Sequence, residues 1–427
     1  MEKVRHLFLL VGSNPLPNAV AGKLLIEAEG KIHLIHSEDS YSIAVRLGKW
    51  LKKENKNLQV SFTEVTEAAP NSIVDGINQE LENVSGLNVT VGLNYTGGTK
   101  MMSVHAYRAL ERWAHKTGKG IKPQFSYLDA GTLRMVFDPH EDNTFFSKSE
   151  YVGLKVNLTF EDLLILHDRK LDNKNPPNEA VILPDTISTL AKYSSKFKGF
   201  TKSWNRMMAI QSQFEKEGLS KPTETELNKA LEKVDAVKTE GDKNKLKEAI
   251  LKAYGKLFQE KSLSSDGNVI FYNQELFRNN KRSFTSWLTG FWLEHYVLSV
   301  LKKLKETLKL ENILQNINVS GCEFELDVVT MRGYQLFAFS CKALSEDGKG
   351  GRKELKLALF EAAVRARQLG GDEAGVALVC CAEDPAGLEE EISQGIGKGR
   401  IKVFGRKHLA DLDDYIKLWI ESQKGEE

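Results

Sequence analysis

Three acidic side chains alternate along one short segment in the C-terminal third of the chain. Glu323, Glu325 and Asp327 are separated by Phe324 and Leu326, so in an extended strand the three carboxylates share one face. Carboxylates on one face repel one another. Solvent relieves that repulsion, and so does a hard divalent cation, which prefers carboxylate oxygens as ligands. The pattern therefore makes this strand a candidate metal site.

A lysine follows at a spacing that suits the same site. Ser340 and Lys342 share one face of the next predicted strand, and a hairpin through 331–333 would bring Lys342 near the acidic face. A metal-holding acid beside a lysine suits phosphodiester hydrolysis: the cation polarises the phosphate and activates water, while the lysine stabilises developing charge. Glu294, inside the apolar helical run 287–297, is either a further acid of this site or a capped or ion-paired side chain.

Two polar loops in the N-terminal part combine glycines with hydrogen-bond donors. They are 12–18 (Gly-Ser-Asn-Pro-Leu-Pro-Asn) and 94–100 (Asn-Tyr-Thr-Gly-Gly-Thr-Lys). Both loops lie at the C-terminal ends of predicted strands, which is where open α/β sheets bind ligands. Paired glycines let the backbone approach a ligand, and the helix after the second loop points amides at an anion. The loops favour a phosphate-bearing ligand over an ordinary turn, but Gly98 stands where a Walker A lysine would be, so ATP hydrolysis is not expected.

Residues 1 to about 150 resemble the CARF domains of type III CRISPR systems. The likeness rests on Thr-Gly-Gly-Thr-Lys at 96–100 and on Gly-Ser-Asn at 12–14. It implies a Rossmann-like homodimer that binds cyclic oligoadenylate across its two-fold axis, with cyclic tetra-adenylate as the expected ring size. The residues implied to face this ligand are Gly12, Ser13, Asn14, Thr96, Gly97, Gly98, Thr99 and Lys100.

The C-terminal part resembles the PD-(D/E)xK nuclease superfamily. Segments 287–297, 325–329, 340–342 and 367–371, within about 265–385, are together similar to CARF-linked effector nucleases that cut single-stranded nucleic acid. The resemblance implies a nuclease dependent on Mn²⁺ or Mg²⁺. Many members carry a second acidic ligand at the position of Ser340, so we expect Glu325 to compensate. The expected catalytic residues are Glu294, Glu325, Asp327, Ser340 and Lys342, with Glu294, Glu325 and Asp327 as the metal ligands.

Hydrophobic patterning predicts an α/β protein that positions these residues in two separate units. Strands are expected at 6–11, 32–36, 58–63, 89–94 and 124–129, with an antiparallel return at 132–137, and helices at 19–29, 40–53, 71–83 and 100–115. We divide the chain into a Rossmann-like CARF sensor (1–165), a linker with a helical insertion (166–263) and a restriction-endonuclease-like α/β domain (264–427). The insertion is rich in Lys and Glu and shows few apolar anchors.

The C-terminal part of the sequence is also predicted to contain both helices and strands. A helix over 286–309 precedes strands at 313–319, 323–330 and 334–342. A helix over 353–368, a buried strand at 375–380, a second helix, a strand at 401–404 and a final helix complete the domain. The four cysteines show no zinc-site spacing and are expected as buried thiols.

Composition limits the classes of partner. Lys plus Arg (59) nearly balance Asp plus Glu (58), which argues against a protein that coats duplex nucleic acid by bulk electrostatics. No apolar run approaches the ~18 residues of a membrane span, so a cytoplasmic protein is expected. Each basic residue near the acidic strand is expected to be a solvated charge on a helix. The alternative is that the residues act as a set and guide a phosphate backbone. They are Lys281, Arg282, Lys302, Lys303, Lys349, Arg352, Lys353, Lys356, Arg365 and Arg367.

The working hypothesis is a homodimer in which cyclic tetra-adenylate shifts the nuclease domains into a cleavage-competent arrangement. It would cut single-stranded RNA or DNA, or nick strained duplex DNA. Two alternatives remain open. The first is a non-catalytic, ligand-gated regulator whose degraded nuclease fold only binds nucleic acid. The second is an enzyme that acts on its own nucleotide at the N-terminal loops.

Overall fold

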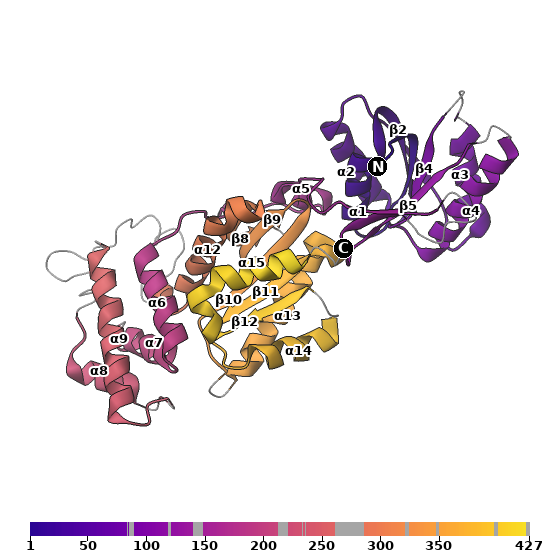
Figure 1. Cartoon of the computed structure of the whole chain (residues 1–427). Helices are drawn as coiled ribbons and strands as arrows, with labels where there is room; N and C mark the ends of the chain where they lie inside the picture. The colour runs from indigo at the N-terminus through magenta and orange to yellow at the C-terminus, as the bar shows by residue number, and fades with distance from the viewer. Residues whose placement is uncertain are drawn as a thin grey trace.

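Two β-sheets, each covered by helices, form the framework of the chain in a computed structural model. The structure describes residues 1–82, 84, 89–117, 121–139, 148–211, 221–232, 234, 236–260, 286–320, 324–346, 350–396 and 400–423. Glu323, Cys322 and the basic residues Lys281, Arg282 and Lys349 lie outside these ranges. The second sheet lies between the N-terminal sheet and a group of helices at the far end of the molecule (Figure 1).

The N-terminal sheet is parallel through its first five strands and antiparallel at one edge. Its strand order is β3-β2-β1-β4-β5-β6-β7. The strands are β1 (Val4–Leu10), β2 (Ile26–His36), β3 (Gln59–Glu64), β4 (Val91–Asn94), β5 (Gln124–Asp129), β6 (Arg134–Phe137) and β7 (Lys148–Tyr151), and the helices are α1 (Leu16–Leu25), α2 (Tyr41–Glu54), α3 (Pro70–Glu82) and α4 (Lys100–Thr117). The predicted antiparallel return is confirmed, because β6 pairs antiparallel with β5.

Alternate residues of the buried strands enter two different cores. Leu7 and Leu9 of β1 pack in the cluster that includes α1 and α2, whereas Phe8 and Leu10 pack with α3 and α4. A parallel strand covered on both faces reads as a continuous apolar run. This explains why 6–11 is apolar without alternation.

The predicted helix over 19–29 is wrong at both ends. Helix α1 begins at Leu16 behind Pro15, with a proline in its first turn, a position that suits proline because the first amides of a helix have no partner within it. It ends at Leu25, and Ile26–His36 forms one long strand whose first residue pairs with Val4. Pairing with β1 therefore outweighs the helical pattern of Ile26 to Glu29.

The C-terminal sheet is mixed, with strand order β12-β11-β10-β9-β8. Strand β9 is antiparallel to both of its neighbours, β8 and β10, whereas β10, β11 and β12 are parallel. The elements are η2 (Trp287–Phe291), α12 (Trp292–Leu308), β8 (Glu311–Val319), β9 (Phe324–Arg332), β10 (Gln335–Lys342), α13 (Gly351–Gly370), η3 (Gly371–Glu373), β11 (Gly375–Cys380), α14 (Pro385–Ile396), β12 (Ile401–Phe404), η4 (Arg406–Asp411) and α15 (Leu412–Ser422). Helices α13 and α14 share a core with one face of this sheet, and α12 and α15 share a core with the other.

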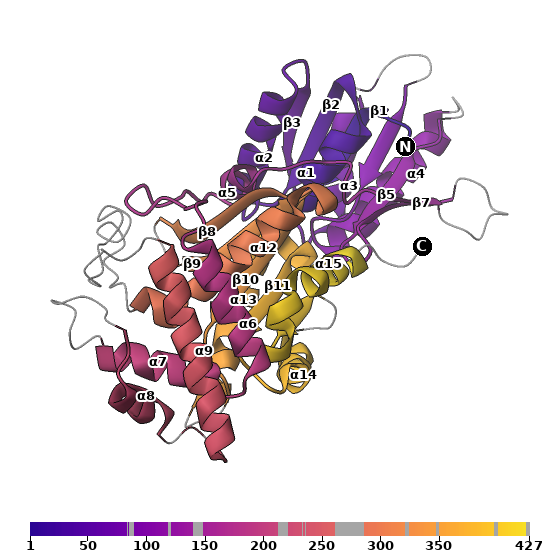
Figure 2. The same cartoon turned by 60° about the vertical axis from the view of Figure 1, so that its left-hand side comes forward.

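The helical insertion is anchored more firmly than its sequence indicates. Its helices are α6 (Pro184–Lys196), α7 (Phe200–Gln211), α8 (Glu224–Leu231) and α9 (Glu240–Gln259). Buried side chains of all four belong to the same core as α12 and α15. Trp204 of α7, for example, donates its indole N–H to the carbonyl of Leu288 at 2.8 Å. The expectation of few apolar anchors is therefore wrong: α6 packs against α12 and η4, and Figure 2 shows α6 in front of the C-terminal unit.

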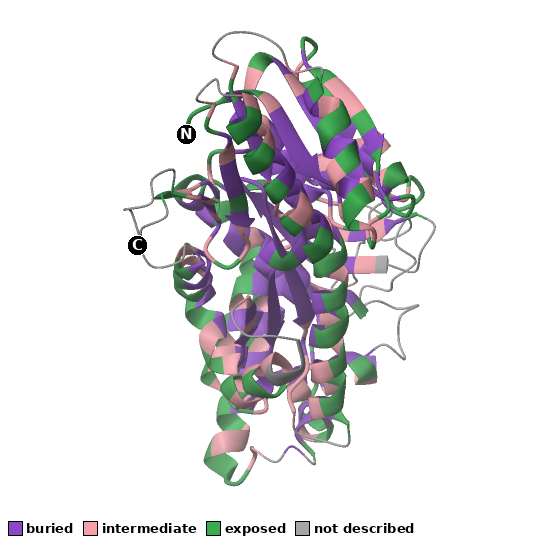
Figure 3. Cartoon of the chain, turned by 90° about the vertical axis from the view of Figure 1, so that its right-hand side faces the viewer, coloured by how far each residue is buried: buried purple, intermediate pink, exposed green. Residues whose placement is uncertain are grey.

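The two sheets are joined by a continuous hydrophobic core. The cluster that includes α1 and α2 of the N-terminal sheet runs through α5 (Phe160–Leu166) into the α13 side of the C-terminal sheet. Figure 3 shows buried residues extending from one sheet into the other. At one crossing point Gly333, with φ of +62°, lies so close to the carbonyl of Gly153 that a side chain would not fit. None of the described helices combines the length and apolar character needed to cross a bilayer.

Candidate ligand and nuclease sites

The two polar loops of the N-terminal part meet at one point of the sheet. A Cβ built on Gly12 would lie 2.9 Å from the amide nitrogen of Gly98, so the two backbones touch. The loops follow β1 and β4, which are neighbouring strands, and the strand order reverses between them. Such a switch point is where open α/β sheets hold their ligands, at the carboxyl ends of the strands.

Glycine is required in the second loop for both space and conformation. Gly98 has φ of +72°, a left-handed conformation that other residues adopt at a cost. A Cβ on Gly97 would collide with the carbonyl oxygen of Leu10 and lie 3.2 Å from Oδ1 of Asn18. Asn18 is buried; its amide donates to Leu10 at 2.9 Å, and its Oδ1 has no partner among the described residues.

The polar side chains of the second loop divide into internal and exposed groups. Thr96 donates to Oδ1 of Asn94 at 2.8 Å and accepts from the amide of Leu128 at 2.6 Å, so its hydroxyl shapes the loop. Thr99 accepts from the amide of Met102 at 3.3 Å and caps α4. Lys100 is exposed at the start of that helix. Backbone amides and Lys100, more than the threonines, are therefore available to an anion.

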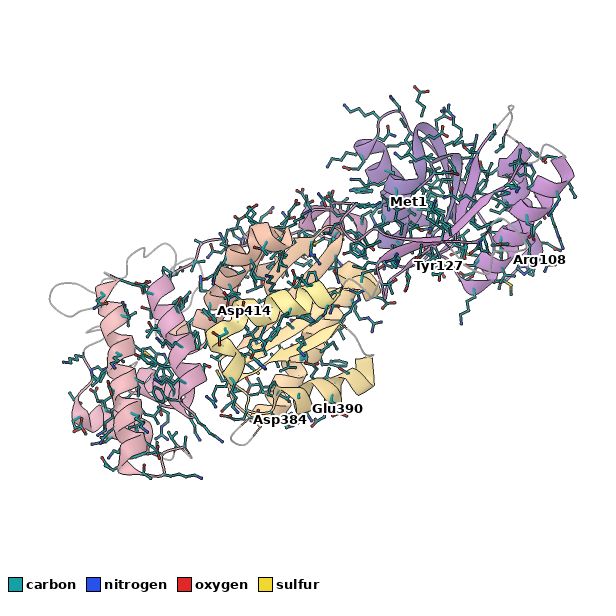
Figure 4. All side chains as sticks on the ribbon, in the orientation of Figure 1. Met1, Arg108, Tyr127, Asp384, Glu390 and Asp414 are labelled. Carbon is teal, nitrogen blue, oxygen red and sulfur yellow. The ribbon has the colours of Figure 1, made fainter. Side chains whose placement is uncertain are left out.

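An exposed apolar patch beside the loops was not predicted. It comprises Met101 (40% exposed) and Val104 (53%) on the first turns of α4 and Tyr127 (37%) on β5. Figure 4 shows Tyr127 and Arg108 on this part of the N-terminal unit. Residues 101 and 104 are one turn apart on the helix surface. That spacing is present in the sequence, but exposure can be assigned only once the buried face of α4 is known.

The acidic strand and the lysine strand form the predicted hairpin. Strands β9 and β10 are antiparallel, with Phe339 opposite Val328. Oδ2 of Asp327 accepts the amide of Cys341 at 2.7 Å and the hydroxyl of Ser340 at 3.2 Å. The ammonium nitrogen of Lys342 lies 3.9 Å from the same oxygen. The structure thus brings Asp327, Ser340 and Lys342 together, through contacts that all fall on one carboxylate oxygen.

The charge of Lys342 is stabilised by its surroundings. Burial alone would lower its pKa, but the carboxylates of Asp327, Glu294 and Glu325 outweigh burial and raise the pKa above its usual value. The neighbouring thiol of Cys341 is fully enclosed, and burial, followed by Asp327 and Glu294, raises its pKa. Lys342 is therefore a permanent cation at neutral pH, and Cys341 is an inert thiol.

Glu294 lies at an irregular helix start. It is 8% exposed in the first turn of α12, directly after the π-helical turn η2, a rare conformation that is found frequently at functional sites. Its charge acts on Lys342 and Cys341. The described residues nevertheless contain no group of three or more His, Cys, Asp or Glu side chains arranged to hold a metal. The expected ligand set of Glu294, Glu325 and Asp327 therefore stays a prediction.

A divalent cation fits the oxygen donors that are present. Oδ1 of Asp327 has no hydrogen bond among the described residues, and its side chain is 15% exposed. Mg²⁺ is commonly held by one or two carboxylates together with water and substrate phosphate, not by a complete protein cage. Asp327, with Glu294 behind it, suits that kind of site.

Among the residues that the structure describes, several of the basic side chains expected near the site are paired within the chain. Arg352 is 2.6 Å from Glu391 and 3.5 Å from Asp384. Asp384 is labelled in Figure 4. Lys303, Lys356 and Arg367 pair with Asp413, Glu391 and Asp372. Those four residues therefore have local acidic partners, and a role of the set in guiding a phosphate backbone stays a prediction. Arg365 pairs with Glu361 of its own helix at 3.7 Å, and its guanidinium also donates to the backbone carbonyl of Glu325 at 2.8 Å.

His295 is a packing residue, as expected. It is buried against Trp287 and accepts the amide of Ile182 at 3.4 Å. Burial lowers its pKa to about 4, so it is neutral at physiological pH. The three described cysteines, Cys341, Cys380 and Cys381, are buried and free, which confirms the expected thiols.

Comparison with solved structures shows the same arrangement of both units. Protein VC1899 from Vibrio cholerae superposes with a TM-score of 0.68 at 16% identity, over 99% of each chain. Can2 from Sulfobacillus thermosulfidooxidans, solved in complex with cyclic tetra-adenylate, superposes with a TM-score of 0.65 at 17% identity, over 98% of this chain and 99% of the other. This chain has the fold of Can2. No protein-family model and no curated protein matches the sequence. The likeness to Can2 confirms the predicted fold class across the chain.

Proposed function

We propose that this protein is a metal-dependent nuclease activated by a cyclic oligoadenylate, expected to be cyclic tetra-adenylate. The observation that carries the enzymatic part is the position of Lys342, 3.9 Å from Asp327 on the neighbouring strand. The cation, Mn²⁺ or Mg²⁺, supplies Lewis-acid activation of water and phosphate when bound. Asp327 holds it, Ser340 orients Asp327, and Lys342 stabilises charge on the phosphate oxygens. The substrate is proposed to be single-stranded RNA or DNA, or strained duplex DNA.

The ligand is proposed to sit where the Gly12 and Gly98 backbones touch. The fold of Can2, a protein solved with cyclic tetra-adenylate, supports this assignment. Helix N-terminal amides and the exposed Lys100 suit the phosphates. A second copy of the chain is proposed to complete the site, because the exposed Met101, Val104 and Tyr127 lie beside it and apolar exposed groups of this kind suit an interface.

The test mixes purified protein with labelled single strands and with plasmid, with and without cyclic tetra-adenylate, in Mn²⁺ or Mg²⁺. Cleavage that needs both ligand and metal, and that Asp327→Ala abolishes, is the expected result. Cleavage that persists in Asp327→Ala would exclude the proposed site.

One observation favours a second candidate function. Because no group of three metal-ligand side chains exists among the described residues, the C-terminal unit could bind nucleic acid without cutting it. In that case ligand-dependent binding of a labelled strand would occur in the wild type, no products would form with either metal, and Asp327→Ala would bind as the wild type does.

A further inference from the structure

The end of helix α13 touches the proposed ligand loop of the N-terminal unit. Gly371, with φ of +65°, starts the turn η3. A Cβ there would collide with the side-chain nitrogen Nδ2 of Asn14 and lie 2.6 Å from Oε2 of Glu373. Oδ1 of Asn14 accepts the amide of Leu16 at 3.0 Å, which fixes the side chain against the turn. The positive φ therefore favours glycine, and a side chain there would have to displace the ends of the Asn14 and Glu373 side chains.

A single guanidinium ties this turn to the N-terminal sheet. Arg400 donates to the carbonyl of Glu373 at 3.1 Å and to the carbonyls of Ala130 and Gly131, the latter at 3.1 Å. Ala130 and Gly131 follow β5 in the N-terminal unit. Arg400 precedes β12 in the C-terminal unit. The geometry makes Arg400 a tether between the two units, at the same turn that Asn14 contacts.

The turn carries a buried carboxyl group, and a buried tyrosine lies near it. Glu373 is 1% exposed, and its backbone carbonyl also accepts from Gln335 at 2.9 Å. Tyr334 is fully buried, and its hydroxyl has no hydrogen-bond partner among the described residues. Buried polar groups are normally satisfied, and a partly satisfied cluster costs free energy. The contact between the units at this turn therefore includes a buried carboxyl group and an unsatisfied buried hydroxyl.

The same helix also reaches the acidic strand. Arg365 of α13 donates to the carbonyl of Glu325 at 2.8 Å, two residues before Asp327. Arg365 lies in the last turns of α13, about 8 Å along the helix from its end at Gly370. Between them Ala366 and Leu369 are buried in the shared core, and a close-packed helix transmits displacement rather than absorbing it. Contacts thus run without a break from Asn14 to the Asp327 strand.

We propose that α13 couples the two sites: ligand at the Gly12–Asn14 loop moves the Gly371–Glu373 turn, and Arg365 carries the movement to the strand that holds Asp327. The inference rests on the proposed function and names its regulation. Arg365 is a positioning residue, and Arg400 sets the resting position of the turn. The ligand must bind one position of the turn more tightly than the other, and the site near Asp327 then affects ligand affinity by the same factor.

The test is amide hydrogen exchange on the full-length protein, with and without cyclic tetra-adenylate. In the wild type, ligand should change exchange at 12–14 and 96–100 and also at 324–332 and 366–373. Arg400→Gln should keep the first change and lose the second. Lys402→Gln, two residues along and paired with Glu389 on the surface, is the matched control and should behave as the wild type does.

A second pair of measurements guards against a merely structural effect. Gly371→Ala should also separate the two exchange responses, because its side chain displaces Asn14. Arg365→Lys should reduce the ratio of ligand-stimulated to basal cleavage about tenfold, within the usual range of coupling.

The outcomes separate the two proposals. No exchange response at 12–14 or 96–100 in the wild type would refute the ligand itself. A response there with none at 324–332, or an unaltered distant response in Arg400→Gln, would overturn the coupling alone. Equal loss of basal and stimulated cleavage in Arg365→Lys would also overturn it.

Discussion

Lys342 combines access to solvent with a strongly negative setting. Its side chain is 39% exposed, and the nearby carboxylates keep it charged. Lys342→Met retains the stem and removes the ammonium group. Losing one group that stabilises developing charge lowers turnover about 10²- to 10³-fold, so initial rates of ligand-stimulated cleavage should fall by that factor.

Lys356→Met is the matched control for this substitution, because Lys356 pairs with Glu391 on the surface of α13. Its cleavage rate should stay near that of the wild type. Wild-type rates in Lys342→Met would remove the lysine from the proposed chemistry.

Glu373 makes stability depend on pH in an unusual direction. Burial raises its pKa from 4.5 to about 7. Between pH 4.5 and about 7 the folded state therefore keeps a proton that the unfolded state has released. This contribution to stability is complete below the pKa of the unfolded state and is lost as the pH rises through about 7. At 1.36 kcal/mol per pKa unit the loss is at most roughly 3 kcal/mol.

Glu373→Gln removes the titrating group. Denaturant unfolding from pH 4.5 to 8 should therefore show a flatter pH profile in the variant than in the wild type. Parallel profiles would mean that Glu373 ionises normally in the folded protein.

At the residue scale, local periodicity predicts part of the site and no more. The contact of Asp327 with Ser340 and Lys342 follows from the two-residue period of strands and a short hairpin. The position of Glu294 does not, because it depends on how α12 crosses the sheet. Segment 367–371 was singled out in the sequence, but the contacts of Gly371 with Asn14 and of Arg400 with Ala130 could not be predicted, since these partners lie far away along the chain.

Two glycines in different elements should respond oppositely to the same substitution. Gly98→Ala places a Cβ 2.9 Å from Cβ of Leu10 in a left-handed conformation, and it should lower the free energy of unfolding by at least about 1–2 kcal/mol. Gly255→Ala lies within α9, where a Cβ meets nothing within 4 Å. It should raise stability by up to about 1 kcal/mol.

Thermal unfolding of the two alanine variants beside the wild type measures both effects. Gly98→Ala should also weaken binding of cyclic tetra-adenylate in calorimetry, whereas Gly255→Ala should leave it unchanged. Equal shifts of the same sign would contradict the assignment of the Gly98 loop.

At the element scale, strands with strong apolar runs were placed well and irregular features were not. The predicted strands 124–129, 375–380 and 401–404 agree with β5, β11 and β12. Strand β7, with the polar sequence Lys148–Tyr151, gave no signal because it is an edge strand. The π turn before α12 was invisible too, since its five residues continue the apolar pattern of the helix.

At the scale of the whole molecule, one core joins the two sheets. Calorimetry should therefore record the N-terminal and C-terminal sheets unfolding in a single transition. Cyclic tetra-adenylate at 100 times its Kd should stabilise that transition by about 2.7 kcal/mol. Two separate transitions, of which ligand moves only one, would show that the units unfold independently.

The shared core also decides how this protein can be taken apart. Helix α5 packs against both α2 and α13 within the shared core, so a fragment cut near position 165 would expose apolar side chains of this core to water. A chimera that joins the N-terminal unit to a different effector domain would have to include α13 and the turn η3. A new linker alone would not replace these contacts.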